Sequence, residues 1–231
     1  MPAMGRRRHR QWVRLRAAMV TALLLASAAL AAAPAHYALD PVHTRVLFAV
    51  GHAGFSQALG TVSGAEGTLV FDPQDWRSAR VDVRVPLARL DLGDDAWNRA
   101  TLGRKLLDAQ RWPEARFQSV RVEPLAPDRF LVHGRLTLRG VTRELPLEVK
   151  FNALRRHPLP PFRRTAGFSA TATLNRSEFG IDAWPSMIGE TVELRIEAEA
   201  VRTRAHGEDE PGNAPDEAAP ATGPTDEDPS P

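Results

Sequence analysis

Residues 39–55 read LDPVHTRVLFAVGHAGF, where one histidine precedes an alternating apolar strand and a second histidine ends it. Successive side chains of a strand point to opposite faces, so positions of one parity share a face. The apolar positions of one parity are Val46, Phe48 and Val50. His52 has that parity and His43 the opposite one. The alternation therefore predicts that the two imidazoles point apart, with His52 at the end of the apolar face.

The same period of two recurs along most of the chain. The clearest cases are residues 79–87, 130–138, 144–151, 168–174 and 192–200. One apolar and one polar face per strand is typical of antiparallel sheets. A helical pattern occurs at residues 94–107, where Asp94 or Asp95 could cap the helix. About eight such strands and a single helix predict an all-β fold, either a closed barrel or a sandwich.

The apolar faces mix bulky side chains with small ones. The small inward residues are Gly67, Gly134, Ala170, Ala172, Ala198 and Ala200. In a barrel of about eight strands, small inward residues leave room for one small ligand. They also suit tight packing between sheets or the taper of a filled barrel, so the pattern alone leaves a cavity and a solid core equally open.

The two ends of the chain differ from this central part. Residues 1–35 carry six arginines and no acid, and an apolar run with small residues precedes Ala35. This pattern predicts a secretory signal peptide and a periplasmic or secreted protein cleaved near Ala35, with an uncleaved membrane anchor as the alternative. Residues 207–231 hold eight acids and six prolines, which predicts a disordered tail. Residues 36–206 then form one domain.

Composition and motifs exclude several classes of function. Removing the six leader arginines from 30 basic residues leaves 24 against 28 acids, which argues against nucleic-acid binding. The chain has no cysteine, so it has no disulfide and no thiol chemistry. We find no nucleophile elbow, phosphate loop or dinucleotide fingerprint. His133, His157 and His206 have no ligand-like spacing to His43 and His52, so we expect no metal site.

Three blocks of sequence carry more specific information. They are HYALDPVHTRVLFAVGHAGFSQALGTVSGAEGTLVFDP (36–73), WPEARFQSVRVEPLAPDRFLVHGRLTLRGVTRELPLEV (112–149), and AGFSATATLNRSEFGI with IGETVELRIEAEA (166–181 and 188–200). In order and spacing, these blocks resemble the YceI-like polyisoprenoid-binding proteins. The stretches 100–107 and 155–164 depart from the family's usual pattern.

The resemblance implies an extended eight-stranded antiparallel barrel of lipocalin-like shape, with one helix inserted after the early strands. It also implies a periplasmic or secreted protein whose barrel holds a long isoprenoid-type chain, without enzyme chemistry. We therefore expect an exported protein that binds a long-chain isoprenoid or related lipid, such as a polyprenyl or an isoprenoid quinone. It would act as a carrier, a reservoir or an envelope-stress factor, with no cofactor.

Two other functions remain open, and so does one further contact. The first is a structural or stress-protective envelope protein with an incidental cavity, and the second is a lipid-modifying enzyme that uses His52. The basic loop at residues 155–164 could contact a membrane peripherally, or it could be a solvated hairpin loop.

The apolar positions of each strand predict which residues line the lipid site. The expected apolar lining is Val46, Phe48, Val50, Leu69, Phe71, Val83, Val85, Phe117, Phe130, Val132, Leu136, Leu147, Phe168 and Leu174. The alternative is that these side chains fill a solid core. His52 and Arg176 are the candidates for a ligand's head group, and the alternative for His52 is a hydrogen-bonded residue that closes the end of the barrel. Arg176 could instead fix its own turn by pairing with an acid such as Glu178.

Overall fold

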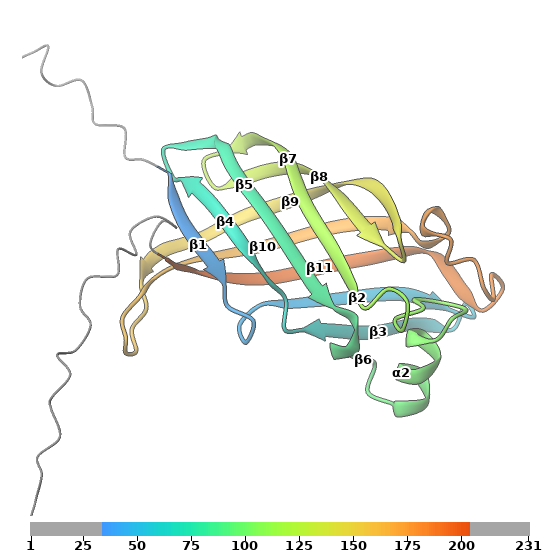
Figure 1. The fold of residues 1–231 in the computed structure, drawn as a ribbon. Coiled ribbons are helices and arrows are strands. Elements are labelled where there is room, and N and C mark those ends of the chain that lie inside the picture. Colours follow the sequence, from blue (N-terminus) through green and yellow to red (C-terminus); the bar gives the residue numbers. More distant parts are fainter. Residues whose placement is uncertain (1–33, 204–231) are drawn as a thin grey trace, which may run out of the picture.

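A computed structural model describes residues 34–203 of the chain (Figure 1). The leader expected over residues 1–35, apart from Pro34 and Ala35, lies outside these described residues. The tail expected over residues 207–231 also lies outside them. Both expectations stay predictions.

The described residues are mostly β-strands. The elements are β1 (Ala35–Leu39), β2 (Arg45–His52), β3 (Ser56–Ser63), β4 (Glu66–Asp72), β5 (Asp75–Pro86), the 3-10 turn η1 (Leu87–Arg89), β6 (Leu90–Asp91), helix α2 (Asp95–Leu102), β7 (Glu114–Ala126), β8 (Arg129–Leu138), β9 (Val141–Arg156), β10 (Arg164–Asn175), the 3-10 turn η2 (Arg176–Phe179) and β11 (Ile188–Arg202). The apolar and polar positions of the long strands alternate as the period of two predicts.

The strands form one antiparallel sheet that closes on itself. Its order is β1-β4-β5-β7-β8-β9-β10-β11, and β1 pairs with β11 to complete an eight-stranded ring (Figure 1). The strands β2, β3 and β6 extend this sheet from the first part of β11. The closed barrel implied by the resemblance is confirmed, and the sandwich alternative is excluded.

The strands β1 and β2 are two halves of one long strand. Leu39 of β1 lies opposite Ala200 of β11, and Arg45 of β2 lies opposite Glu197 of the same strand. The break between the halves falls at residues 40–44. One continuous strand, β11, pairs with both halves.

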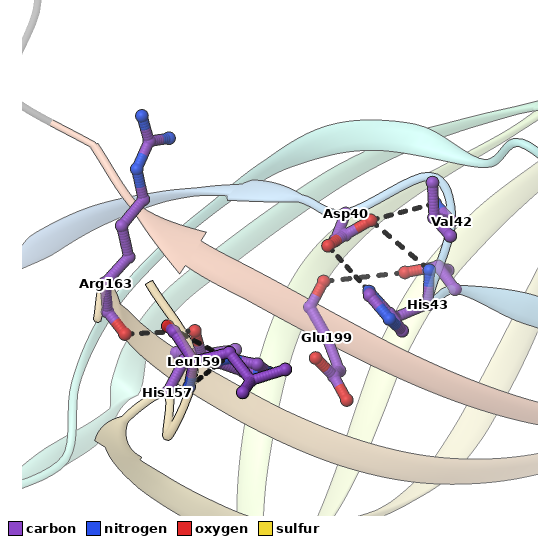
Figure 2. A network of polar contacts seen from close by, with 9 residues as sticks. Asp40, Val42, His43, His157, Leu159, Arg163 and Glu199 are labelled. Carbon is purple, nitrogen blue, oxygen red and sulfur yellow. Dashed lines mark hydrogen bonds and ion pairs between the residues drawn. The ribbon is translucent and has the colours of Figure 1, made fainter. Parts of the chain in front are cut away.

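Local hydrogen bonds build this break (Figure 2). The Asp40 carboxylate accepts the backbone N–H of Val42 at 2.8 Å and that of His43 at 3.3 Å, as in an Asx turn. The Asp40 backbone N–H and the Thr44 hydroxyl both donate to the Glu199 carbonyl, at 2.8 Å and 3.5 Å. The His43 ring stays on the exposed turn, with Nδ1 2.8 Å from the Asp40 carboxylate.

Helix α2 is shorter than the sequence pattern predicts. Asp94 caps it as expected, because its carboxylate accepts the backbone N–H of Trp97 at 2.9 Å. The helix ends at Leu102, and Gly103 follows in extended backbone. The expected continuation to residue 107 is therefore wrong. No helix within residues 34–203 has both the length and the apolar character needed to cross a membrane.

The two ends of the barrel are built differently (Figure 1). At one end lie the β4–β5, β7–β8 and β9–β10 connections. At the other end lie the β2–β3 turn, α2, the β8–β9 turn and the β10–β11 connection. Only the second end carries helical structure, and we refer to it as the α2 end.

Arg139 ties three connections together at the α2 end. Its guanidinium donates to the carbonyl of Gly180, after η2, and to the carbonyl of Arg104, after α2. Arg139 and Gly140 form the β8–β9 turn with φ of 51° and 75°. A Cβ on Gly140 would lie 2.5 Å from the Trp112 ring, so this turn needs glycine for both its backbone and its close contact.

Candidate functional site

A cavity of about 660 Å³ lies inside the barrel. The expected lining residues that contribute to its wall are Val46, Phe48, Val50, Leu69, Val83, Val85, Phe117, Phe130, Val132, Leu136, Leu147, Phe168 and Leu174. Every expected lining residue except Phe71 is therefore in the wall. The sequence left a filled core and a cavity equally open, and the structure shows a cavity. That these residues bind a ligand stays a prediction.

Stacked aromatic rings close the cavity at the end away from α2. We call this cluster the aromatic floor, and its members are Tyr37, Phe71, Trp76, Phe130, Phe151 and Phe168. The Trp76 and Phe130 ring centroids are 4.1 Å apart, and those of Phe71 and Trp76 are 5.1 Å apart. Burial raises the pKa of the Tyr37 hydroxyl above its ordinary value. Packed rings fill this end of the barrel.

Phe71 belongs to the floor rather than to the cavity wall, which corrects the expectation from its strand phase. Its side chain is fully buried, at 0% exposure. Phe71 keeps the inward parity of Leu69, because their partners on β1 are Ala35 and Tyr37 in regular register, but neighbouring rings cover it. Its ring packs between those of Tyr37, at 4.8 Å, and Trp76.

The other end of the cavity opens beside α2. We call this opening the mouth, and its residues are His52, Trp97, Trp184 and Met187. Trp97, Trp184 and Met187 are 44%, 42% and 48% exposed although they line the cavity. The His52 and Trp97 ring centroids are 5.1 Å apart. The Lys105 ammonium lies 5.3 Å above the Trp184 ring, within range of a cation–π contact.

Arg176 lines the cavity, but its guanidinium is already occupied. It is 3% exposed and donates to the backbone carbonyls of Gly189, Ile181, Ala183 and Ile188, at 2.7 to 3.0 Å. These four bonds hold the β10–β11 connection against β11. Arg176 thus fixes its turn, and it does so through carbonyls rather than through the acid that the sequence suggested.

The expected partner of Arg176, Glu178, lies elsewhere. Its carboxylate accepts from the Asn175 side-chain amide at 3.4 Å. His52 keeps its place at the end of the apolar face and lines the mouth. Of the two head-group candidates, His52 is the one whose ring remains available to a ligand.

Small inward residues create only part of the space. Ala170 and Ala198 line the cavity as expected, whereas Ala200 is fully buried. A Cβ on Gly134 would lie 2.2 Å from the Phe117 ring. The space at Gly134 is therefore filled by its neighbour, and Gly134 serves close packing rather than the cavity.

In the described part of the cavity wall, the arginine side chains are already hydrogen-bonded to backbone carbonyls. The arginines among its lining residues are Arg80 and Arg176. Arg80 donates to the backbone carbonyls of Arg77 and Ala79. An anionic group deep in the barrel would therefore lack a free counter-charge, and an apolar chain is the better fit. Within residues 34–203, no group of three or more histidine or acidic side chains could hold a metal ion.

The Asp40–His43 pair is the clearest titrating pair outside the cavity. The hydrogen bond to Asp40 and its negative charge raise the pKa of His43 from its ordinary value of 6.5. Burial would raise the pKa of Asp40, but the hydrogen bonds from the His43 ring and from two backbone N–H groups lower it further than burial raises it. The pair stabilises the turn between β1 and β2 and takes no part in the cavity.

A model of the YceI-like domain matches residues 37–200. The chain belongs to the YceI-like family. The match runs from within β1 to within β11 and so covers nearly the whole barrel.

Related sequences and structures agree with this assignment to the YceI-like family. A UPF0312 protein of Pseudomonas syringae pv. syringae (strain B728a) is 33% identical over 189 residues, which cover 81% of this chain and 95% of that protein. The Burkholderia cenocepacia BcnA structure has a TM-score of 0.63 at 20% identity, over 70% of this chain and 98% of BcnA. A polyisoprenoid binding domain from Saccharophagus degradans has a TM-score of 0.55 at 12% identity, over 72% of this chain and 98% of that domain. Both structures share the YceI-like fold.

The tryptophans at the two ends of this YceI-like cavity were not found from the sequence. Trp76 lines the cavity although its parity differs from that of Ala79 and Val81 on the same strand. The irregular start of β5 explains this difference. Trp97 lies on a helix and Trp184 in a loop, so the period of two does not apply to them. Their one signal was that large aromatic residues interrupt otherwise polar connections.

Proposed function

We propose that this chain binds one long isoprenoid-type lipid, such as a polyprenyl or an isoprenoid quinone, inside its barrel and holds it as a carrier or reservoir. The cavity carries this proposal, because it is long, apolar, closed at the floor and open at the mouth. The Saccharophagus degradans domain of the same fold is described as polyisoprenoid binding, which supports the choice of ligand class. We propose binding without turnover of the lipid.

The energetics favour binding but give little selectivity. Burying one methylene contributes about 0.8 kcal/mol, so a chain of roughly 25 carbons gains about 20 kcal/mol before costs. Ordering the flexible chain offsets much of this gain. Any long apolar chain would then bind, and selectivity must come from the length of the cavity and from its mouth.

The test is mass spectrometry of organic extracts from the full chain, expressed for export and purified without detergent. We expect an isoprenoid lipid at close to one per protein, recovered chemically unchanged. The matched variants are Leu194→Gln, in the cavity wall, and Arg195→Gln, the exposed next residue of β11. We expect the first to lose the lipid and the second to keep it.

Two results would contradict the proposal. A preparation without any bound lipid would favour the structural or stress-protective alternative. A lipid recovered in altered form would favour the enzyme alternative, with His52 as the candidate catalytic residue.

Export is part of the same proposal and has its own test. The basic and apolar start of the chain supports it. We expect the protein in the periplasm or the medium, with an intact mass that lacks residues 1–35. Full-length protein in the membrane fraction would instead favour the uncleaved anchor.

A peripheral membrane contact through residues 155–164 also belongs to this proposal. Leu159 and Phe162 are 64% and 50% exposed at the tip of the β9–β10 loop. The loop is held by the bond from the His157 backbone N–H to the Arg163 carbonyl at 2.8 Å (Figure 2). The exposed arginines beside the tip are Arg155, Arg156, Arg163 and Arg164. An apolar tip among basic residues suits an anionic bilayer surface.

Cosedimentation with phosphatidylglycerol-containing liposomes tests this contact. We expect binding that weakens when all four arginines of the loop are changed to glutamate. The control is charge reversal at four arginines on other strands: Arg84, Arg121, Arg135 and Arg195. If the loop variant binds the liposomes unchanged, the alternative of a solvated hairpin loop is favoured.

A further inference from the structure

Away from the mouth, the cavity ends at packed aromatic rings, which limits what it can hold. The indole of Trp76 and the rings of Phe130 and Phe168 form its inner end. Behind them, Phe71 is 0% and Tyr37 2% exposed. A chain that enters at the mouth therefore meets a wall of packed rings and cannot pass through the barrel.

The depth of the cavity follows from the strand that spans it. Along β11, the wall runs from Ile188 at the mouth to Ala198, which lies opposite Phe168 at the floor. A rise of about 3.4 Å per residue and a strand tilt of about 40° give a depth of roughly 26 Å along the barrel axis. An extended carbon chain with bonds of about 1.5 Å advances roughly 1.25 Å per bond, so about 20 main-chain carbons fit. An isoprenoid of that length has about five isoprene units.

The volume of the cavity gives the same answer independently. An apolar protein cavity of about 150 Å³ holds one benzene molecule, with its six carbons. On this scale, a cavity of about 660 Å³ holds roughly 26 carbons. This again corresponds to about five isoprene units.

We propose that the aromatic floor acts as a length gauge, which selects isoprenoid chains of about five units by stopping the tail at Trp76. The inference rests on the proposed function, since it assumes that an isoprenoid chain enters the cavity. Chains up to the limit bury each added unit, whereas longer chains leave their remaining units in water outside the mouth. Affinity therefore rises with length and then stops rising.

Trp76 is the residue that sets the limit most directly. It lines the cavity and also stacks on the two rings behind it, Phe130 and Phe71. Replacing its indole with a methyl group adds space at the end of the cavity, in line with a bound chain. Trp184 offers a matched comparison, because it is also a tryptophan of the cavity wall but lies at the mouth.

The experiment measures the affinity of the full chain for polyprenols of increasing length, by native mass spectrometry without detergent. For the unmodified protein, we expect each added unit to raise affinity tenfold or more up to about five units, and little beyond. Trp76→Ala should move this limit up by about one unit. Trp184→Ala should change the affinities without moving the limit.

A second variant tests the gauge from the other side, in case Trp76→Ala does not fold. Ala170 faces the cavity near the floor, and Ala170→Leu should move the limit down by about one unit. The inference is overturned if Trp76→Ala or Ala170→Leu folds and leaves the limit unchanged, or if the parent shows no limit. If the parent binds no polyprenol of any length, the proposed function itself is wrong.

Discussion

The two ends of this barrel use the same kind of side chain for opposite purposes. At the floor, Phe71 and Phe130 are 0% and 2% exposed, and their rings pack on Trp76. At the mouth, Trp97 and Trp184 remain 44% and 42% exposed beside His52. Aromatic rings packed on one another exclude water and close the barrel, whereas rings spaced around an opening leave it accessible.

The difference shows how a barrel of this size becomes a container. A fully packed interior would hold no ligand, and an interior open at both ends would have no fixed depth. Closing one end with rings concentrates stability at the floor. The mouth is then free to be less stable and to exchange a ligand.

The largest expected effect tests whether stability is concentrated at the floor. Phe130→Ala should lower the free energy of unfolding by about 3–5 kcal/mol, because it empties a buried and stacked ring position. Trp184→Ala should cost about 1 kcal/mol or less, because that ring is partly exposed. Urea unfolding of both variants measures the difference. Equal losses of unfolding free energy in the two variants would contradict the proposed difference in stability between floor and mouth.

The next effect tests what holds the mouth in shape. Arg176→Met should cost about 2–4 kcal/mol, since four buried carbonyls lose their charged donor. Amide hydrogen exchange should quicken most in residues 181–188, next to the mouth. Arg195→Met, which removes an exposed arginine of β11, is the control and should cost less than about 1 kcal/mol. Protection that is lost evenly over the whole barrel would argue against a local role.

A smaller effect concerns the helix beside the mouth. Asp94→Ala removes the N-cap of α2 and should cost about 1 kcal/mol. Exchange of the Trp97 amide should quicken while the floor strands keep their protection. Asp95→Ala, which leaves the cap in place, should have roughly half this effect. If Asp94→Ala also speeds amide exchange in the floor strands, the mouth and the floor are not independent in stability.

The smallest effect lies at the turn between β1 and β2, remote from the mouth. Because the folded state raises the pKa of His43, this pair's stabilisation is present below the ordinary histidine pKa and is lost as pH rises through the raised value. Because Asp40 has a lowered pKa, the stabilisation is also lost as pH falls through that value. The whole contribution should be less than about 1 kcal/mol, since the pair is exposed.

Nuclear magnetic resonance titration measures this pair directly. Asp40→Asn should bring the pKa of His43 back toward 6.5. Glu199→Gln, which removes a weaker and more distant charge, should shift it much less. A pKa of His43 that does not respond to Asp40→Asn would contradict the ion pair.

The sequence predicted the barrel wall well because one rule governs it. Along β2, the parity of Val46, Phe48 and Val50 placed all three in the cavity wall, and His52 at the mouth. Period-two alternation is a property of each strand, so it needs no knowledge of the strand's neighbours. The rule placed Phe71 correctly on the inner face, but it could not show that the rings of Tyr37 and Trp76 pack over Phe71.

The mouth could be predicted less well because it depends on contacts between distant segments. Arg176 was a candidate for the head group, with a turn fixed by pairing to an acid such as Glu178 as the alternative. Its carbonyl partners come from the connection that folds back over it, which no local pattern reveals. Trp97 and Trp184 belong to segments far apart in the sequence and both line the cavity, so their common position at the mouth follows from topology alone.

The most direct test of the account asks which way a lipid chain lies in the cavity. Two variants would keep Trp76 or Trp184 as their only tryptophan, with the others changed to phenylalanine. Each would bind a long-chain alcohol that carries bromine, a contact quencher of indole fluorescence, at one end or the other. We predict that bromine at the tail quenches Trp76 and that bromine beside the hydroxyl quenches Trp184. The reverse pattern, equal quenching at both sites or no quenching at all would contradict a chain that enters at the mouth and stops at the floor.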